Sequence, residues 1–262
     1  MKTALIAFLG EMRKSLLVTW TYRANELVSM FTLGFVFLGI GFLIGEGELD
    51  PDQLAFMFVG YLAWFYTAAV IGNLAWGLRA EMSAGTLEQM SMGAAPVGLM
   101  LTARVVAGLL VVTVQIILQG LAFFMLLDVR IPLHWEGLPV LAVMMAGLFG
   151  FGYIVAGATL VFKQFESLAN VVQNALLFLN GTMMPIDVMP GWLATFARTL
   201  PSTQGVIVLH RVVLDGQSLA AVWRDGSLVW LIVHSVVYLV AGWLVFGICE
   251  RVAKNWGSLG QY

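Results

Sequence analysis

Long apolar stretches separated by short polar segments dominate the chain. Continuous apolar runs long enough to cross a bilayer predict six transmembrane helices. The expected spans are 24–44, 54–78, 97–127, 138–162, 168–184 and 228–248. A transmembrane β-barrel would instead show short alternating segments. The pattern therefore predicts an all-α polytopic membrane protein with a single transmembrane domain over 1–262. In the fourth span, Ala142, Ala146 and Gly150 recur every four residues and predict a face for tight helix packing.

Residues 1–22 show helical periodicity instead of a continuous apolar run. Glu11 and Lys14 fall opposite an apolar face, which consists of Leu5, Leu9, Met12, Leu16 and Trp20. This arrangement predicts an amphipathic helix that lies in the membrane interface. A soluble helix packed on a partner domain is the alternative, and the two interpretations are compatible because the helix has two faces.

Residues 185–227 break the apolar pattern, because Pro185, Pro190 and Pro201 occur at short intervals. Amphipathic periodicity nevertheless continues between the prolines. Irregular backbone at membrane depth is tolerated only where protein covers it. We therefore expect short re-entrant helices that dip into the outer leaflet between the fifth and sixth spans.

The basic residues orient the predicted spans, because cytoplasmic loops carry an excess of Lys and Arg. Nine of the 13 fall in segments or helix ends that alternate topology places inside, and four fall outside. The two sets are Lys2, Arg13, Lys14, Arg23, Arg79, Arg104, Lys163, Arg251 and Lys254 against Arg130, Arg198, Arg211 and Arg224. We expect a multi-pass protein of the cytoplasmic (inner) membrane with both termini cytoplasmic.

Composition supports the membrane class and narrows the chemistry. Hydrophobic residues make up 60% of the chain and charged residues 11%, whereas a soluble domain carries roughly 25% charged residues. A net charge of −2 gives nucleic-acid binding no electrostatic support. The single cysteine, Cys249, excludes an internal disulfide and a cysteine metal cluster, and we expect no metal site. Because the chain lacks a G-x-x-x-x-G-K-[ST] phosphate loop, we expect it to hold no cofactor and no ATP site.

Residues 81–96 form a polar segment between the second and third spans. Ser83 is a candidate helix cap with Glu88 following, and Pro96 can open the next apolar run. This pattern predicts a short amphipathic helix at the membrane surface, which Arg79 and Arg104 place on the cytoplasmic side. A solvated turn that only joins two spans is the simpler alternative.

Two motifs resemble those of ABC-2-type exporter permeases. The first is the E-x-x-x-G-T-L-E…P pattern formed by Glu81, Gly85, Thr86, Leu87, Glu88 and Pro96. The second is Pro185-Ile-Asp187-Val-Met-Pro190-Gly191-Trp192, followed by Leu200-Pro201 and by Arg211…Leu214-Asp215-Gly216. Together with the N-terminal helix and the six spans, the resemblance covers nearly the whole chain.

The resemblance implies the type V exporter architecture, in which two permease copies pair in the bilayer above two ATPase subunits that hold ATP and Mg. The first motif would be the coupling helix, with Glu81, Gly85, Thr86 and Glu88 meeting the ATPase. The second would mark an outer gate formed by Pro185, Pro190, Trp192 and Pro201. The chain looks more similar to drug and lipid exporters than to polysaccharide exporters, because it lacks their basic Arg-Tyr-Arg-type stretch and Asn-Pro step. A polysaccharide exporter remains an alternative.

A pathway between two copies needs facing helices of mixed character. The fifth span offers amides and the second span offers rings and one further amide; the set is Asn170, Gln173, Asn174, Asn180, Phe65, Tyr66 and Asn73. Neutral amides and rings suit an amphiphilic, drug-like or lipid-like substrate. The alternative is that the amides join helices and the rings only pack.

Two other function classes are weighed against the exporter. A gradient-driven secondary transporter usually needs an ionisable group deep in the membrane, and only His234 is placed there. An intramembrane enzyme would need a nucleophile and a base, but Ser235 and His234 are adjacent on a helix and point apart. No hydrolase or metalloprotease motif occurs. The exporter permease is therefore the leading hypothesis.

Overall fold

The computed structural model describes residues 2–93, 95–129, 134–162, 165–182 and 186–255. These ranges contain helices and no strands. The α-helices are α1 Lys2–Thr21, α2 Arg23–Ile44, α3 Pro51–Ile71, α4 Gly77–Ser83, α5 Leu87–Ser91, α6 Val97–Leu127, α7 Gly137–Val161, α8 Phe165–Leu179, α9 Gly191–Ala197, α10 Pro201–Leu209, α11 Leu219–Arg224 and α12 Ser227–Asn255. Two π-helices, η1 Gly72–Trp76 and η3 His210–Leu214, and one 3-10 helix, η2 Ile186–Val188, join them.

Five of the helices in the described ranges are long and apolar enough to cross a membrane. They cover 23–44, 51–83, 97–127, 137–161 and 227–255, and each coincides with a span expected from the sequence. Helix α8, where the fifth span was expected, has 15 residues. A helix that crosses the hydrocarbon core needs about 20 residues, so a sixth crossing stays a prediction.

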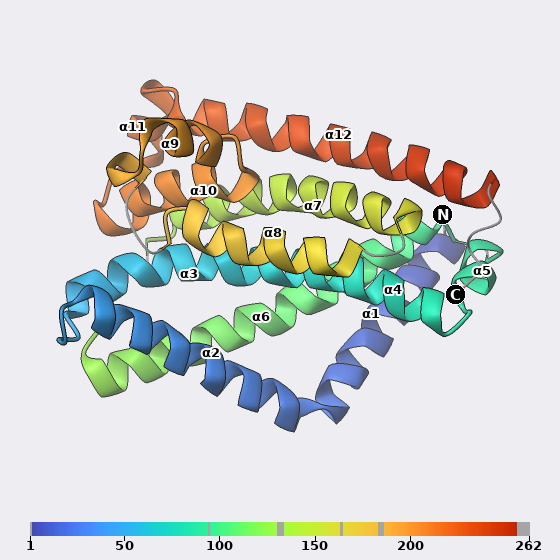
Figure 1. Cartoon of the computed structure of the whole chain (residues 1–262), viewed down its shortest axis with the longest axis horizontal. Coiled ribbons are helices and arrows are strands. Elements are labelled where there is room, and N and C mark those ends of the chain that lie inside the picture. Colours follow the sequence, from blue (N-terminus) through green and yellow to red (C-terminus); the bar gives the residue numbers. More distant parts are fainter. Residues whose placement is uncertain (1, 94, 130–133, 163–164, 183–185, 256–262) are drawn as a thin grey trace.

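The long helices lie along one axis and alternate in direction (Figure 1). Helices α4 and α5 lie at one end of this bundle, together with the start of α1 and the end of α12. Helices α9, α10 and α11 lie at the opposite end, the end at which the connection between α2 and α3 also lies. The predicted coupling segment and the predicted re-entrant segment are therefore separated by the length of the bundle.

Helix α3 is the centre of the core. It packs against α6, α7, α8 and α10, and most of its side chains are buried. Its aromatic residues join a cluster of rings from two other helices. The ring of Tyr61 in α3 lies 4.8 Å from that of Phe37 in α2, between centroids. Phe37 in turn lies 5.2 Å from Phe123 of α6. Such ring pairs add roughly 0.5–1.5 kcal/mol each beyond the area they bury.

Helix α1 packs on α6. Glu11 of its polar face is buried. Of the predicted apolar face, Leu5 and Trp20 are 59% and 68% exposed, whereas Met12 and Leu16 are half-buried. Part of the apolar face is therefore open to lipid, and its insertion into the membrane interface stays a prediction.

The short helix expected within residues 81–96 does not begin at Ser83. Ser83 is the last residue of α4, and its hydroxyl donates to the carbonyl of Arg79 at 2.6 Å. Ser83 therefore does not cap the next helix, and the expected N-cap was wrong. Glu81 belongs to α4, which continues the second span, and the chain turns at Gly85 with φ +67°. Pro96 occupies the N-cap position of α6, as expected.

Candidate functional site

Arg104 forms a buried charge cluster at the end of the bundle that carries the predicted coupling segment. Its Nε lies 2.5 Å from Oε1 of Glu11 in α1, and its Nη2 lies 2.5 Å from Oε1 of Glu81 in α4. The side chains of Arg104, Glu11 and Glu81 are only 12%, 7% and 18% exposed. One guanidinium therefore joins three helices that lie far apart in the sequence.

Two further side chains complete this cluster. The hydroxyl of Thr86 donates to the other carboxylate oxygen of Glu81, and Lys14 Nζ lies 3.4 Å from Oε1 of Glu11. The two carboxylates are thus balanced by two cations. A buried ion pair whose partner is removed leaves an uncompensated charge, which costs about 3–5 kcal/mol. The cluster therefore fixes α1, α4 and α6 relative to one another.

The predicted coupling residues lie in two different environments. Glu81 and Thr86 are bound within the chain, whereas Gly85 has open space where a side chain would project. Glu88 lies in α5, but its side chain falls outside what is described. The exposed surface of the segment includes Gln89 and Met92. Contact with an ATPase stays a prediction for all four residues.

The two rings predicted to line a substrate path are packed inside the chain. Phe65 meets Tyr61 edge to face at 4.7 Å between centroids. The hydroxyls of Tyr66 and Thr113 are 2.9 Å apart. Both rings are buried, so in a single chain they serve as core packing, the alternative weighed from the sequence.

Asn73 lies in the π-helix η1, between α3 and α4. Its Nδ2 donates to the carbonyl of Ala69 at 2.8 Å. The amide also rests on Gly108 of α6, where a Cβ would collide with it. π-Bulges are rare and occur frequently at functional sites. The polar residue singled out in this span therefore marks a local irregularity of its backbone.

The predicted amide stripe divides into two parts. Asn170 and Asn174 are exposed on α8 and Gln173 is half-buried, while the backbone carbonyl of Gln173 accepts from Trp64 Nε1 at 3.0 Å. Asn180 follows the helix and is fully buried. Its Oδ1 accepts from the backbone N–H of Thr182 at 3.1 Å. Asn180 therefore shapes the turn after α8 and is not part of the exposed strip.

The predicted outer-gate residues lie at the opposite end of the bundle. Pro190 occupies the position before α9, and Pro201 opens α10 and is buried. Trp192 is exposed, whereas Pro185 lies outside the described residues. The order of prolines expected from the sequence thus corresponds to the starts of two short helices.

His210 connects this end to the second span and was not singled out from the sequence. Its ring stacks on Phe56 at 4.1 Å between centroids, and its Nε2 lies 3.0 Å from the Phe56 carbonyl. Burial lowers the pKa of His210 to about 4, so the neutral ring donates through Nε2–H.

Arg211, the next residue, ties η3 to the start of α12. Its guanidinium donates to Ser227 Oγ at 2.6 Å and to Gln217 Oε1 at 3.0 Å, and it pairs with Asp225. Hydrogen bonds from the backbone and side chain of Ser227, and then from Arg211, lower the pKa of Asp225 to about 2.

Glu11 and Arg104 are the residues that sequence reasoning missed at the coupling end. A signal was present, because an ionisable residue inside an apolar helix is expensive unless it is paired. Arg104 lies inside the third apolar run and Glu11 on the first helix, but nothing local indicates that they meet. Within the described ranges, no group of three His, Cys, Asp or Glu side chains could hold a metal ion.

Comparison with known proteins identifies the family of this chain. No significant match was found among curated proteins. The chain matches the family described as ABC-2 type transporter over residues 7–214, a region that runs from α1 to η3 and includes the Arg104 cluster and His210. The resemblance inferred from the two motifs is thereby confirmed. With its five long apolar helices, the chain is a multi-pass membrane protein that belongs to the ABC-2 type transporter family.

Proposed function

We propose that this chain is the permease subunit of an ATP-driven exporter that moves an amphiphilic substrate across the cytoplasmic membrane. Separate ATPase subunits, two per complex, would bind at residues 81–96 and hold the ATP and Mg. A second permease copy would complete the pathway. Family membership supports an ABC-type permease; the direction, the substrate and the coupling are the proposal.

The observation that carries the proposal is the position of Arg104 between Glu11 and Glu81. A partner that pushes on the segment after α4 acts on a helix that is ion-paired to α6 and is linked through the same arginine to α1. Because separating these buried charges costs several kcal/mol, the three helices should move as one body. Movement imposed at the membrane surface would then reach the spans that continue from α4 and α6.

The α8 strip supports a pathway formed with a second copy. Asn170 and Asn174 are exposed in the single chain. Polar side chains in membrane segments usually face other protein or a water-filled cavity and not lipid. A second copy against α8 would satisfy this preference. Amides on facing helices would then offer neutral hydrogen-bonding groups to the head of an amphiphile while the bilayer receives its apolar part.

Site-specific cross-linking tests the docking of an ATPase. Met92 and Trp192 are 74% and 75% exposed and lie at opposite ends of the bundle. With p-benzoylphenylalanine in place of Met92, irradiation of the complex should give an adduct with an ATP-binding subunit. The same probe at Trp192, the matched control, should give none. An adduct from Trp192 and none from Met92 contradicts the assignment.

A second measurement tests the substrate class. Amphiphilic drugs or lipids should stimulate ATP hydrolysis by the reconstituted complex. The double variant Asn170→Leu/Asn174→Leu should lose this stimulation and keep basal hydrolysis, whereas Asn255→Leu, which changes an exposed asparagine at the end of α12, should respond like the parent. Stimulation by hydrophilic solutes alone, or transport by the chain without any ATPase, would contradict the proposal and favour a polysaccharide or a gradient-driven mechanism.

A further inference from the structure

One side of α1 is exposed along most of the helix and is apolar except at one position. Ile6, Leu9, Arg13, Leu17 and Trp20 recur every three or four residues, which places them on one face of a helix. All five are exposed, and they are called the exposed face of α1 from here on. An arginine therefore lies at the centre of an apolar surface that the rest of the described chain leaves open.

The exposed face of α1 leads directly to a membrane span. Helix α1 ends at Thr21, and α2, one of the five helices long and apolar enough to cross a membrane, begins at Arg23. Figure 1 shows the two helices meeting at a corner on one side of the bundle. Trp20 and Tyr22 are exposed at this corner, and such aromatic residues are enriched where a membrane meets water. This end of α1 therefore lies at the level of the lipid head groups.

Two arginines near this corner keep donors available for a ligand. Arg13 makes no hydrogen bond or ion pair with the residues that the structure describes. The guanidinium of Arg23 lies 5.3 Å from the centre of the Trp20 ring, and its Nη1 donates to the Trp20 carbonyl at 3.3 Å. A guanidinium carries five N–H donors, so Arg23 can bond to a further group while it rests on the ring.

The acidic residues of this part of the chain are already bonded. Glu11 and Glu26 are the acidic residues of positions 1–44. Glu11 is buried and pairs with Arg104 and Lys14, at about 200° around the helix axis from the arginine of the exposed face. Glu26 accepts from Gln115 Nε2 at 3.0 Å. Neither carboxylate therefore neutralises the exposed face.

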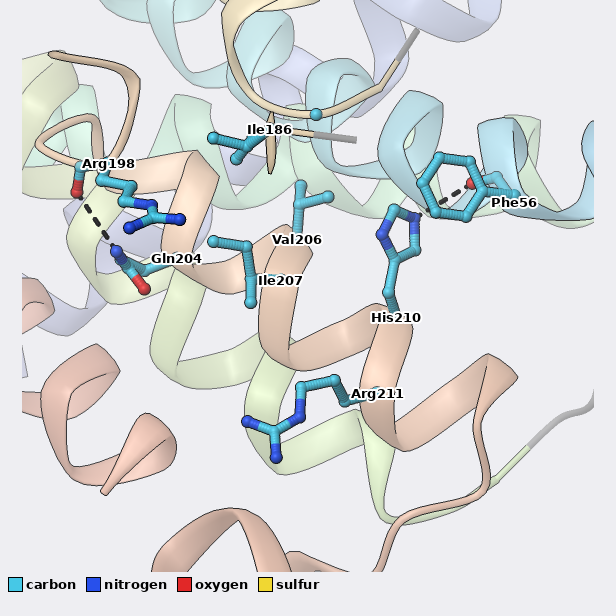
Figure 2. Close-up of a pocket in the computed structure, with 9 residues that line it drawn as sticks. Phe56, Ile186, Arg198, Gln204, Val206, Ile207, His210 and Arg211 are labelled. Carbon is cyan, nitrogen blue, oxygen red and sulfur yellow. Dashed lines mark hydrogen bonds between the residues drawn. The ribbon is translucent and has the colours of Figure 1, made fainter. Parts of the chain in front are cut away.

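Arginines at the opposite end of the bundle differ in this respect. Figure 2 shows Arg198 and Arg211 beside a cavity of about 440 Å³. Arg211 is already ion-paired with Asp225 and bonded to Ser227, and Arg198 also has a partner within the chain. Their charges are engaged inside the protein, so that cavity offers an anion less than the exposed face of α1 does.

We propose that the exposed face of α1 binds the anionic head groups of the adjoining lipid leaflet. Arg13 and Arg23 each pair with a lipid phosphate, to which a guanidinium can donate two parallel hydrogen bonds. They are ten residues apart, roughly 15 Å along a helix, so they meet different lipids. The apolar stem of Arg13 lies among its apolar neighbours while the charged group reaches the head groups, as in interfacial amphipathic helices.

This binding connects the lipid surface to the Arg104 cluster. The same helix presents Arg13 to the lipid on one side and Glu11 to Arg104 on the other. Head groups that hold α1 at the membrane surface therefore also hold Glu11 against α6. The binding of an anionic lipid surface does not depend on what the chain transports or on which subunit supplies energy.

A fluorophore on the exposed face tests the proposal. In a Cys249→Ser background, Leu17→Cys carries NBD one helical turn from Arg13. The full chain is placed in nanodiscs of phosphatidylcholine alone or of an equal mixture with phosphatidylglycerol, and dithionite reduces the NBD that is open to water. The ratio of protected to accessible NBD should be several-fold higher with phosphatidylglycerol. High salt should reduce this difference, because it screens exposed charges.

Substitutions of the arginine identify the source of the effect. Arg13→Gln should lower the ratio about fivefold in discs with phosphatidylglycerol, as expected for one basic residue near an anionic surface. Arg13→Lys keeps the charge and should respond like the parent. Lys254→Gln is the matched control, because it removes one cation from an exposed pair at the end of the bundle where α1 begins, and it should also respond like the parent.

Three results would overturn the proposal. The first is equal protection of the parent in the two lipids, or an unchanged lipid dependence in the double variant Arg13→Gln/Arg23→Gln. The second is equal protection when a cationic lipid replaces phosphatidylglycerol, because apolar contact alone would then hold the helix. The third is protection that appears only after an ATPase subunit is added, in either lipid, which would assign a protein partner to this face.

Discussion

Gly242 of α12 lies directly against the backbone of Gly150 of α7. A Cβ on Gly242 would lie 2.8 Å from the Cα of Gly150 and closer still to its carbonyl. The same contact line continues where Gly147 meets Ser235 and where Gly157 meets Phe246. Without side chains in between, the two backbones approach closely, which is how small residues drive helix association in membranes.

This contact predicts an asymmetric response to the same substitution in α12. Gly242→Ala should destabilise the protein by about 1–3 kcal/mol, because the added methyl overpacks the interface. Gly247→Ala is the control, since a Cβ there meets nothing within 4 Å and alanine favours helix by up to ~1 kcal/mol. Thermal unfolding in detergent measures both. Equal losses in the two variants would contradict the proposed contact.

The helix-packing face shows what the sequence could and could not determine. Spacing by four predicted a face through Ala142, Ala146 and Gly150. Gly150 is indeed at the contact, but Ala142 is exposed and Ala146 only half-buried. The actual line passes through Gly147, Gly150 and Gly157, because a helical face drifts with a period of 3.6 residues. Periodicity located the helix and one contact residue but not the direction of the face.

The site residues show a second limit. Hydropathy placed the long spans well, because apolar length is a property of each segment alone. Glu11 lies 93 residues from its partner Arg104, and Phe56 lies 154 residues from its partner His210. A single chain carries no local signal for such pairs. The Arg104 cluster and the stack of His210 on Phe56 therefore had to come from the structure, whereas the proline-started helices α9 and α10 followed from local pattern.

The Arg104 cluster predicts a large effect from one neutral substitution. Arg104→Gln leaves Glu11 and Glu81 without their shared cation and should cost about 3–5 kcal/mol of unfolding free energy. Lys254→Gln is the control, because its pair with Glu250 is exposed and lies within one helix, and exposed pairs contribute about 0–1 kcal/mol. Denaturant unfolding in mixed micelles measures both.

A triple variant separates the effect of the charges on stability from the effect of side-chain packing in this cluster. In the triple variant Glu11→Gln/Arg104→Gln/Glu81→Gln no buried charge remains, so most of the lost stability should return. Coupling to an ATPase should stay impaired if the ion pairs transmit movement between α1, α4 and α6. A triple variant that is no more stable than Arg104→Gln would show that the guanidinium acts by shape alone.

His210 predicts a pH dependence of stability with a definite sign. Its folded-state pKa is about 4, below the ordinary value near 6.5, because burial disfavours the charged ring while Asp215 acts in the opposite direction. Between these values the unfolded chain binds a proton that the folded chain does not. The contribution of His210 to the free energy of unfolding is therefore at its full value above pH 6.5. It falls as the pH drops toward 4, by at most ~1.4 kcal/mol per pH unit.

The measurement is the unfolding midpoint from pH 7.5 to 4.5. His210→Phe keeps a ring against Phe56 but cannot titrate, so its midpoint should fall less steeply than that of the parent. His134→Phe, which changes an exposed histidine before α7, should keep the parent's slope. A slope unaffected by His210→Phe, or reduced equally by His134→Phe, would refute the assignment.

The predicted topology assigns the two ends of the bundle to opposite sides of the membrane, on the basis of the distribution of Lys and Arg. The connection between α2 and α3 and the short helices α9 to α11 lie at one end (Figure 1), and the end of α12 lies at the other. In a Cys249→Ser background, Glu48→Cys and Arg224→Cys sample the first end and Asn255→Cys the second, all at exposed positions. An impermeant maleimide added to intact cells should label the first two, and Asn255→Cys only after permeabilisation. Because all three positions are exposed, a cysteine that is not labelled is shielded by the membrane and not by burial in the protein.

Labelling of Asn255→Cys in intact cells, with Arg224→Cys protected, would invert the orientation and place residues 81–96 where no cytoplasmic ATPase could reach them.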